Sequence, residues 1–447
     1  MRHLLPRLAA GLFAALAGAA PAAAQFQSVF ATPLPPGPGT VPFVPNSTLA
    51  APVLLPVGAP TAAPVAIYTY GQPQPAAAAP ITPAAPVVGP DCGPAVPGCE
   101  APARCGGRFW ASADFFYGAS QGVWLPPLVT LAPPGTPSPG AGALYSPNGI
   151  ILFGGQRELT STRPGFRVGG GYWFDDARTR GIDASLIYLG RLSEEFIGSS
   201  GPGGVVLARP IVGTGGVNAG VPVAGPFPGG VTASAGTSFI GGDVNYRRSL
   251  CGGDCCRWDL LVGYRYLHLG DTVDVWQTNS TLVPTPGLGS ADVLVHDSIH
   301  TRNDFHGGQV GLTSVCRLGG GFTLDLWAKV ALGVTVAHAD ASGTTQVPAL
   351  LPGTTVPTGL LVTPTNARAD SDTDFAVAPE AGLKLGYDVT NWLRVNAGYE
   401  FLYWSKVRRA ADQIDLTVDP ATGRPAFRDR TTDLWVQGWT LGVQVSF

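Results

Sequence analysis

The chain has 447 residues, of which 45% are hydrophobic and only 13% charged, and it contains 61 glycines and 43 prolines. This glycine and proline usage exceeds that of average globular domains and favours many turns and low-complexity segments. A formal net charge of −3 gives no electrostatic basis for binding nucleic acid, so we expect no nucleic-acid partner.

Two N-terminal segments precede the part of the chain that is predicted to fold. Residues 1–24 begin with Arg2 and Arg7, continue with an apolar run and end in three alanines, which is typical of a cleaved signal peptide. Residues 25–104 are rich in Ala and Pro and almost uncharged. Such a segment can form neither a β-ladder nor a packed core. It predicts a disordered periplasmic arm of a length suited to tether a periplasmic or cell-wall partner.

Alternation of apolar and polar residues predicts about ten strands between residues 105 and 447. Pro379 falls inside one of them and predicts a bulge. Four short turns alternate with five long connections, near 119–162, 190–235, 270–303, 338–373 and 405–432. The predicted strands are 108–117, 166–174, 182–188, 240–246, 258–266, 305–318, 322–336, 375–387, 393–403 and 435–447.

The two classes of connection point to a membrane barrel. Outer-membrane barrels have an even strand number, short periplasmic turns and long outer loops, whereas a soluble β-sandwich, the alternative, has no reason to sort its connections by length. No apolar segment after the signal is long enough for a spanning helix, and only a closed barrel can otherwise cross lipid. We therefore predict an all-β, antiparallel transmembrane β-barrel in outer-membrane lipid, with about ten strands, or twelve if a connection hides a hairpin.

The last strand predicts how the barrel is assembled. Its apolar face ends in an aromatic residue, which resembles the C-terminal signature that the barrel assembly machinery of bacteria recognises. This face consists of Trp439, Leu441, Val443, Val445 and Phe447. Aromatic residues also predict two interfacial girdles. The girdle on the turn side holds Tyr172, Trp173, Phe174, Tyr387, Trp392 and Phe447, and that on the loop side holds Tyr117, Tyr403, Trp404 and Trp435.

The polar face of the strands is expected to line the barrel lumen. Its charged residues are Arg108, Asp114, Arg167, Asp183, Asp243, Arg247, Asp259, Arg265, Asp325, Lys329, Glu380, Lys384, Arg394 and Glu400. The acids and bases balance, and residues four apart on one strand are expected to pair: Asp243 with Arg247, Asp325 with Lys329, and Glu380 with Lys384. Two hypotheses remain: a neutral, salt-bridged lumen that stabilises the barrel, or the selective wall of a narrow polar channel. Ten strands permit at most a narrow pore.

Cysteines and other candidate ligands give no strong metal prediction. Export to an oxidising compartment favours disulfides among Cys251, Cys255, Cys256 and Cys316, with the pairing undecided; zinc binding by the first three is the lesser alternative. Cys92, Cys99 and Cys105 form a separate N-terminal group.

Other polar residues in the predicted loops support no cofactor site. Asp412, Gln413 and Asp415 predict a hydrogen-bonded loop rather than a calcium site. His296, His300 and His306 predict solvated loop histidines rather than catalytic ones. We expect no cofactor and no resident metal.

Several motifs resemble a known family. W-L-P-P-L-V-T from Trp124, R-P-G-F-R-V-G-G-G-Y-W-F from Arg163, F-A-V-A-P-E from Phe375, and G-Y-E-F-L-Y-W-S-K-V from Gly398 with D-Q-I-D from Asp412 are similar to the bacterial outer-membrane family called putative beta-barrel porin 7. The resemblance covers roughly residues 105–447 and implies an outer-membrane barrel, without catalytic residues to carry over.

Together these features give two main functional hypotheses. The first is a porin that passes small polar solutes passively through a narrow, charge-balanced lumen. The second is a non-conducting barrel that serves as a surface adhesin or structural envelope anchor through its long loops. An outer-membrane hydrolase is a third and weaker hypothesis, because no base and nucleophile are placed together.

Overall fold

The computed structural model describes residues 107–146, 149–252, 255–282, 290–348 and 354–447. The predicted signal peptide, the proline-rich arm and the three N-terminal cysteines lie outside the described residues. Within the described residues, no helix is long and apolar enough to cross a membrane.

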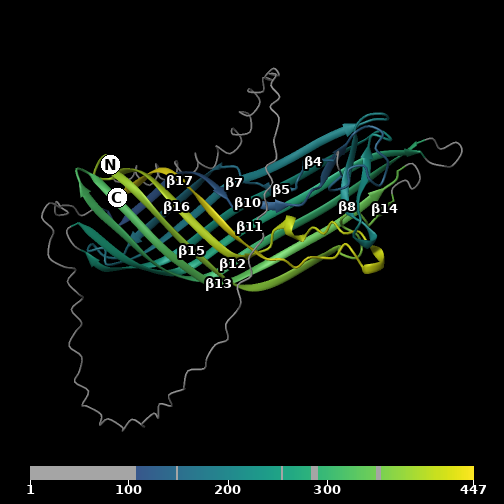
Figure 1. Ribbon diagram of the computed structural model, residues 1–447. Coiled ribbons are helices and arrows are strands. Elements are labelled where there is room, and N and C mark those ends of the chain that lie inside the picture. Colours follow the sequence, from purple (N-terminus) through teal and green to yellow (C-terminus); the bar gives the residue numbers. More distant parts are fainter. Residues whose placement is uncertain (1–106, 147–148, 253–254, 283–289, 349–353) are drawn as a thin grey trace, which may run out of the picture. The chain divides into compact units, whose positions relative to one another are not determined.

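Ten antiparallel strands close into one barrel (Figure 1), which confirms the predicted fold class. They follow the order β12-β11-β10-β7-β6-β1-β17-β16-β15-β13, and β12 pairs with β13 to complete the ring. The short strand β14 (Thr355–Val356) adds to β13 at one end. The barrel strands are β1 (Phe109–Ser120), β6 (Arg163–Trp173), β7 (Arg180–Ser200), β10 (Gly229–Gly252), β11 (Cys256–Leu282), β12 (Ser290–Gly319), β13 (Phe322–Gln346), β15 (Arg368–Asp388), β16 (Leu393–Val407) and β17 (Thr432–Ser446).

The first and last strands join along their whole length, from Trp110 opposite Ser446 to Ser120 opposite Val436. The terminal residue extends this seam, because Phe447 and Phe109 exchange two backbone hydrogen bonds of 2.9 Å. This seam closes the sheet into a barrel, as the predicted fold class requires. Pro379 does not form the bulge expected of it, since it stands in regular register opposite Val330. Its missing N–H is tolerated where the β15–β16 ladder stops, at Glu380 opposite Leu402.

Several predicted loops are wrong because the strands continue through them. β11 and β12 have 27 and 30 residues and leave only a short connection where residues 270–303 were expected to form a loop. β7, β10, β13 and β15 are likewise 21 to 25 residues long. Above the membrane a strand no longer needs an apolar outer face, so the alternation that identifies a lipid-facing strand is lost there although the backbone pairing continues.

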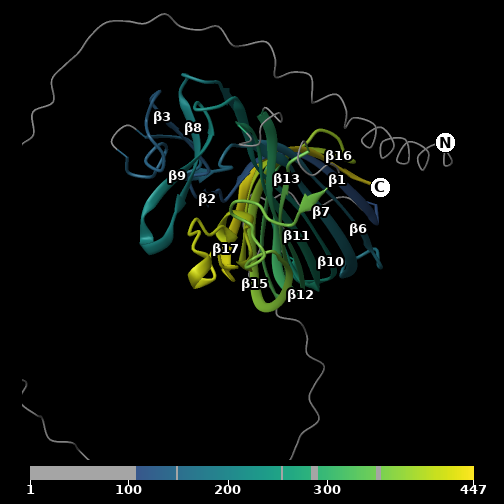
Figure 2. The same ribbon diagram turned by 90° about the vertical axis from the view of Figure 1, so that its right-hand side faces the viewer.

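The remaining connections fold into small sheets at the loop end. β2 (Val123–Leu125) pairs with β5 (Gln156–Glu158), and β3 (Val129–Ala132), β4 (Ile150–Phe153), β8 (Val206–Val212) and β9 (Asn218–Ala224) form a four-stranded sheet. The 3-10 turns η2 (Thr214–Gly216), η3 (Ala410–Gln413) and η4 (Pro420–Thr422) lie in the same connections. Figure 1 places β4, β5 and β8 at the opposite end of the barrel from the C-terminus, and Figure 2 views the barrel from that end.

The outer surface carries the expected apolar band, with two exceptions among the aromatic residues. On β13, Val330, Leu332 and Val334 are 40%, 52% and 39% exposed, as a lipid-facing strand requires. Trp173 and Trp404 were predicted in the girdles, but both are buried inside the barrel. Each follows the inward alternation of its strand, and inside the barrel each finds a polar partner.

One disulfide joins neighbouring strands near a short turn. Cys256 and Cys316 stand opposite each other on β11 and β12 and are bonded, and Cys255 is disulfide-bonded as well. This overturns the zinc alternative, because oxidised cysteines offer no thiolate to a metal. Among the described residues, no group of three or more His, Cys, Asp or Glu side chains could hold a metal ion.

Candidate functional site: the barrel interior

Strand alternation turns most of the predicted lumen residues toward the barrel axis. Residues such as Asp114, Asp243 and Glu400 are at most 5% exposed, while their neighbours along each strand face outward. Arg108 differs: it precedes β1, and its guanidinium contacts Asp176 of the β6–β7 turn at 2.8 Å, with both side chains exposed. It therefore sits at the turn end, outside the interior network.

Six of these side chains form one continuous network across the interior, which we call the ion belt. Arg167 bridges Glu400 at 2.5 Å and Glu380 at 3.0 Å. Glu380 also pairs with Arg265, which pairs with Asp243 at 3.0 Å. The members are Arg167, Asp243, Arg265, Lys329, Glu380 and Glu400, and Lys329 closes the network with a contact of 2.9 Å to Asp243. None of these side chains is more than 10% exposed.

A polar cavity of about 1010 Å³ lies on the turn side of the ion belt. Its wall carries further ion pairs, including Arg247 with Asp259 at 2.9 Å and Lys384 with Asp114 at 2.6 Å. The buried ring of Trp173 also lies here, 4.2 Å from the guanidinium carbon of Arg257. Two further contacts between predicted lumen residues are looser, with Arg247 and Asp183 at 3.5 Å and Arg394 and Asp325 at 3.7 Å.

The predicted pairing within single strands is wrong. Asp243 pairs with Lys329 and Arg265 rather than with Arg247, and Lys384 reaches across to Asp114 rather than to Glu380. Residues four apart on a strand are separated by about 13 Å at about 3.3 Å per residue, which exceeds the reach of a direct ion pair. Partners on neighbouring or facing strands are much closer, so charge balance is achieved between strands.

An apolar layer fills the interior on the loop side of the ion belt. Its members come from nine of the ten barrel strands, so they meet across the lumen. Phe116, Phe239, Phe305 and Trp404 are at most 1% exposed. The Trp404 indole N–H donates to Thr335 at 2.8 Å, and its ring meets Phe305 edge to face at 6.1 Å. The other members are Ile187, Leu189, Leu267, Leu269, Ala331, Ala376, Ala378, Leu402, Val407, Leu434 and Val436.

The connection between β16 and β17 folds inward above this layer. Asn303 of β12 holds its start, accepting from the Arg408 N–H at 2.7 Å and donating to the Arg408 carbonyl at 2.8 Å. The buried Arg409 guanidinium pairs with Asp271 of β11, and the turn η3 that follows is buried with it. The stretch Arg408–Ala411 thus forms the inserted part of the loop.

Further loops pack against the insertion at the loop end of the barrel. Asp297 of β12 is 3% exposed and accepts from the N–H groups of Leu361 and Val362 at 3.0 and 2.8 Å. The same carboxylate pairs with buried Arg209 of β8 at 2.6 Å. An apolar core joins these loops to the upper ends of the strands, and Ile414 belongs to it. We call this assembly of loops the cap.

Asp415 organises the outer part of the inserted loop by hydrogen bonding. Its carboxylate accepts from the backbone N–H groups of Ala426 and Thr417 at 2.8 and 3.1 Å and pairs with Arg424 at 2.6 Å. Burial raises the pKa of Asp415, but these donors outweigh it and hold the pKa below its ordinary value. Gln413 donates to the carbonyl of Arg430 at 3.0 Å. The loop-stabilising hydrogen-bond cluster predicted at this motif is thereby observed for Gln413 and Asp415.

The apolar layer is the main feature that the sequence interpretation missed. Its signal was present in the sequence, because on most barrel strands the inward positions become apolar on the loop side of the charged residues. Asp114 is followed two residues later by Phe116, and Glu400 is followed by Leu402 and Trp404. The three histidines of the third predicted loop lie instead on β12, where His296 and His300 face Asp274 at 3.2 and 3.7 Å.

Comparisons with known proteins place this architecture in a family. Solved structures similar to the chain include the outer membrane protease OmpT from Escherichia coli, with 12% identity, coverage of 76% of this chain and 97% of that chain, and a TM-score of 0.38. A Pseudomonas aeruginosa FadL homologue has 8% identity, coverage of 76% of this chain and 90% of that chain, and a TM-score of 0.21. The P. putida toluene transporter TodX has 8% identity, coverage of 77% of this chain and 91% of that chain, and a TM-score of 0.17.

At these TM-scores the similarities carry no argument about activity. No curated protein matches the chain. The family model described as "Putative beta barrel porin-7 (BBP7)" matches residues 110–447. This range contains all ten barrel strands apart from Phe109, the first residue of β1. The chain therefore belongs to the putative beta barrel porin-7 family.

Proposed function

We propose that this protein is an outer-membrane β-barrel that is closed in its resting conformation and displays a folded cap outside the cell, as a surface or structural barrel. The apolar layer carries this proposal. Side chains from nine strands meet in it, and its four large aromatic residues are almost fully buried. A hydrated ion or sugar crossing the layer would lose its water and gain no hydrogen-bond partner. We assign the protein no catalytic role.

Two other features support a closed interior. The ion belt is held by pairs of opposite charge that leave at most 10% of any member exposed. Arg409 and η3 of the inserted loop are buried above the apolar layer. A solute would have to displace three successive barriers. The partner that we expect for the proline-rich arm stays a prediction.

Planar-bilayer recording tests the proposal. The wild-type barrel should insert without reproducible conductance steps, whereas the triple variant Phe116→Ser, Phe239→Ser and Phe305→Ser should leak, because it removes three rings and makes the layer wettable. Trp439→Ala is the matched control, since its ring is 68% exposed on the outer face. Regular steps from a folded wild-type sample would overturn the closed-barrel proposal.

Passive passage of small polar solutes is the second candidate function. The cavity of about 1010 Å³ favours it, because a wide polar vestibule already occupies the turn side of the barrel. Passage would then require the apolar layer and the inserted loop to move. Swelling of wild-type proteoliposomes in isosmotic small sugars would support this candidate, and the balanced charge of the vestibule predicts weak ion selectivity. Unchanged liposome volume would exclude passive passage and leave the closed surface or structural barrel as the proposed function.

A further inference from the structure

The outer surface of the barrel becomes polar within a few residues of the same height on four neighbouring strands, earliest on β11 and β12, where His268 and His306 lie below Gly270 and Arg302. On β13 the outward residues are apolar up to Val336 and then change to His338 and Asp340. Ser238 of β10, Gly270 of β11, Arg302 of β12 and His338 stand directly opposite one another in a single row. The row lies above exposed Tyr264, so it falls where the headgroups of the outer leaflet meet a membrane barrel.

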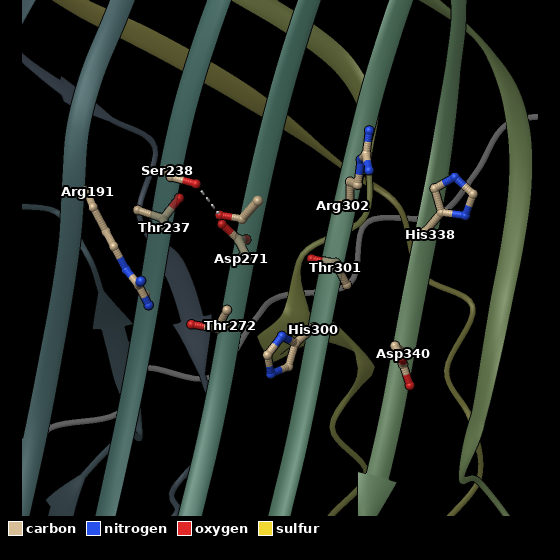
Figure 3. Close-up of a pocket in the computed structure, with 12 residues that line it drawn as sticks. Arg191, Thr237, Ser238, Asp271, Thr272, His300, Thr301, Arg302, His338 and Asp340 are labelled. Carbon is tan, nitrogen blue, oxygen red and sulfur yellow. Dashed lines mark hydrogen bonds between the residues drawn. The ribbon is translucent and has the colours of Figure 1, made fainter. Parts of the chain in front are cut away.

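A groove of about 290 Å³ occupies this height (Figure 3). Two of its lining residues are glycines, which form its floor. Gly236 and Gly270 line it together with the Ser238 and Thr272 side chains. A Cβ atom built on Gly236 would lie 2.9 Å from the Thr272 hydroxyl oxygen and 3.5 Å from Arg191 Nη2. The glycine thus creates the hollow, and Arg191 lies beside it.

Two arginines flank the floor from opposite sides. Arg191 comes from β7, and in the part of the chain that the structure describes it has no ion-pair partner. Arg302 comes from β12, two strands beyond Gly236, and its side chain is 64% exposed although it contacts Asp304 at 2.6 Å. β7 and β12 are three strands apart, about 14 Å at about 4.8 Å per strand, so Arg191 is the arginine beside the floor and Arg302 lies at the far edge of the groove.

Of the carboxylates that line the groove, Asp271 pairs with Arg409, and Asp340 lies one strand from Arg302 but far from Arg191. Asp304 accepts from Tyr266 at 2.6 Å and contacts His268 at 2.8 Å in addition to Arg302. Asp340 stands three strands from Gly236 along its row, about 14 Å away at about 4.8 Å per strand. The end of the groove near Arg191 therefore has a positive potential, with hydroxyl and backbone donors beneath it.

We propose that this groove binds the phosphate headgroup of an outer-leaflet lipid, whose acyl chains lie along the apolar band below. The inference rests on the outer-membrane location proposed above. Arginine binds phosphate with two parallel hydrogen bonds, and the membrane presents lipid phosphates at this height. A volume of about 290 Å³ suits a headgroup and is small for a larger soluble ligand.

Native mass spectrometry of the folded barrel in an uncharged detergent tests the proposal. The probes are short-chain phosphatidic acid, the matching diacylglycerol without phosphate, and inorganic phosphate. Wild-type protein should bind one phosphatidic acid more tightly than either other probe. The double variant Arg191→Gln and Arg302→Gln should bind about 30-fold more weakly, at about fivefold for each arginine near a headgroup.

Two further variants keep the test independent of charge and folding. Gly236→Val should abolish binding by filling the hollow while both arginines remain. Lys406→Gln, which removes an exposed cation on β16, should leave binding unchanged. Equal binding by the double variant, or inorganic phosphate bound as tightly as phosphatidic acid, would overturn the lipid site. Neither readout depends on conductance, so the closed-barrel proposal can fail while this one stands.

Discussion

Replacing Glu380 by glutamine is expected to lower the free energy of unfolding by about 3 kcal/mol. The carboxylate sits between Arg167 and Arg265 and also accepts from the Trp327 indole N–H at 2.9 Å. Removing one partner of a buried ion pair costs roughly 3–5 kcal/mol, because the other charge is left uncompensated. The lower end applies, since Arg167 keeps Glu400 and Arg265 keeps Asp243.

Urea unfolding of the barrel refolded into lipid vesicles, followed by tryptophan fluorescence, measures this change. The matched control is Arg108→Gln, which breaks an exposed pair and should cost less than about 1 kcal/mol. A cycle with Arg265→Gln should give a coupling energy of about 1–3 kcal/mol with Glu380→Gln. A loss below about 1 kcal/mol for Glu380→Gln would show that water screens the ion belt and would refute the reasoning.

Three further predictions concern the disulfide, the C-terminus and the inserted loop. Cys256→Ser should destabilise the barrel by about 4 kcal/mol, since the bond to Cys316 closes a loop with a sequence separation of 60. Reduction of the wild type should cost at least as much, because it also breaks the disulfide of Cys255, and a stability equal to that of the oxidised protein would contradict this. Deletion of Phe447 should reduce the amount of assembled barrel in cells several-fold while Phe447→Tyr does not, and normal levels of the deletion would exclude an assembly role. Because the pKa of Asp415 is depressed in the folded protein, its contribution is complete above the ordinary carboxyl pKa of about 3.9 and is lost as pH falls through the lower folded value. Proteolysis of residues 415–428 by an acid-stable protease should therefore rise below about pH 4, and the Asp415→Asn loop should be cut to a similar extent at all pH values; an unchanged wild-type pattern at low pH would contradict this.

The strands of the membrane band could be predicted from the sequence because lipid imposes a strict two-residue period on them. On β13 every second residue from Phe322 to Val336 is apolar, and the predicted register follows from that alone. Inward charges such as Arg265 and Glu380 were found for the same reason, as the polar half of the alternation.

The ion pairs and the side chains that fill the lumen could not be predicted from alternation, because both depend on which strands face each other across the barrel. The contact between Lys384 and Asp114 joins residues 270 positions apart, and no periodicity within one strand indicates it. The insertion of Arg408 and Arg409 was also hidden, since consecutive arginines in a long connection usually indicate a solvated loop. Their burial depends on Asn303 and Asp271, which belong to strand segments that had been predicted as loop or loop boundary.

Because β11 has 27 residues, its first half has an outer face suited to lipid and its second half has an outer face suited to water. From Trp258 to Tyr264 its outer face is apolar, and its inner face carries Asp259 and Arg265. Beyond that point the pattern inverts: Leu267 and Val273 point inward and His268 and Thr272 point outward. The loop-side half of the barrel is therefore built like a water-soluble protein, with apolar residues inside and polar residues outside. A polar substitution on the outer face should be tolerated there. The same substitution a few residues closer to the turn end, on the lipid-facing surface, should destabilise the barrel.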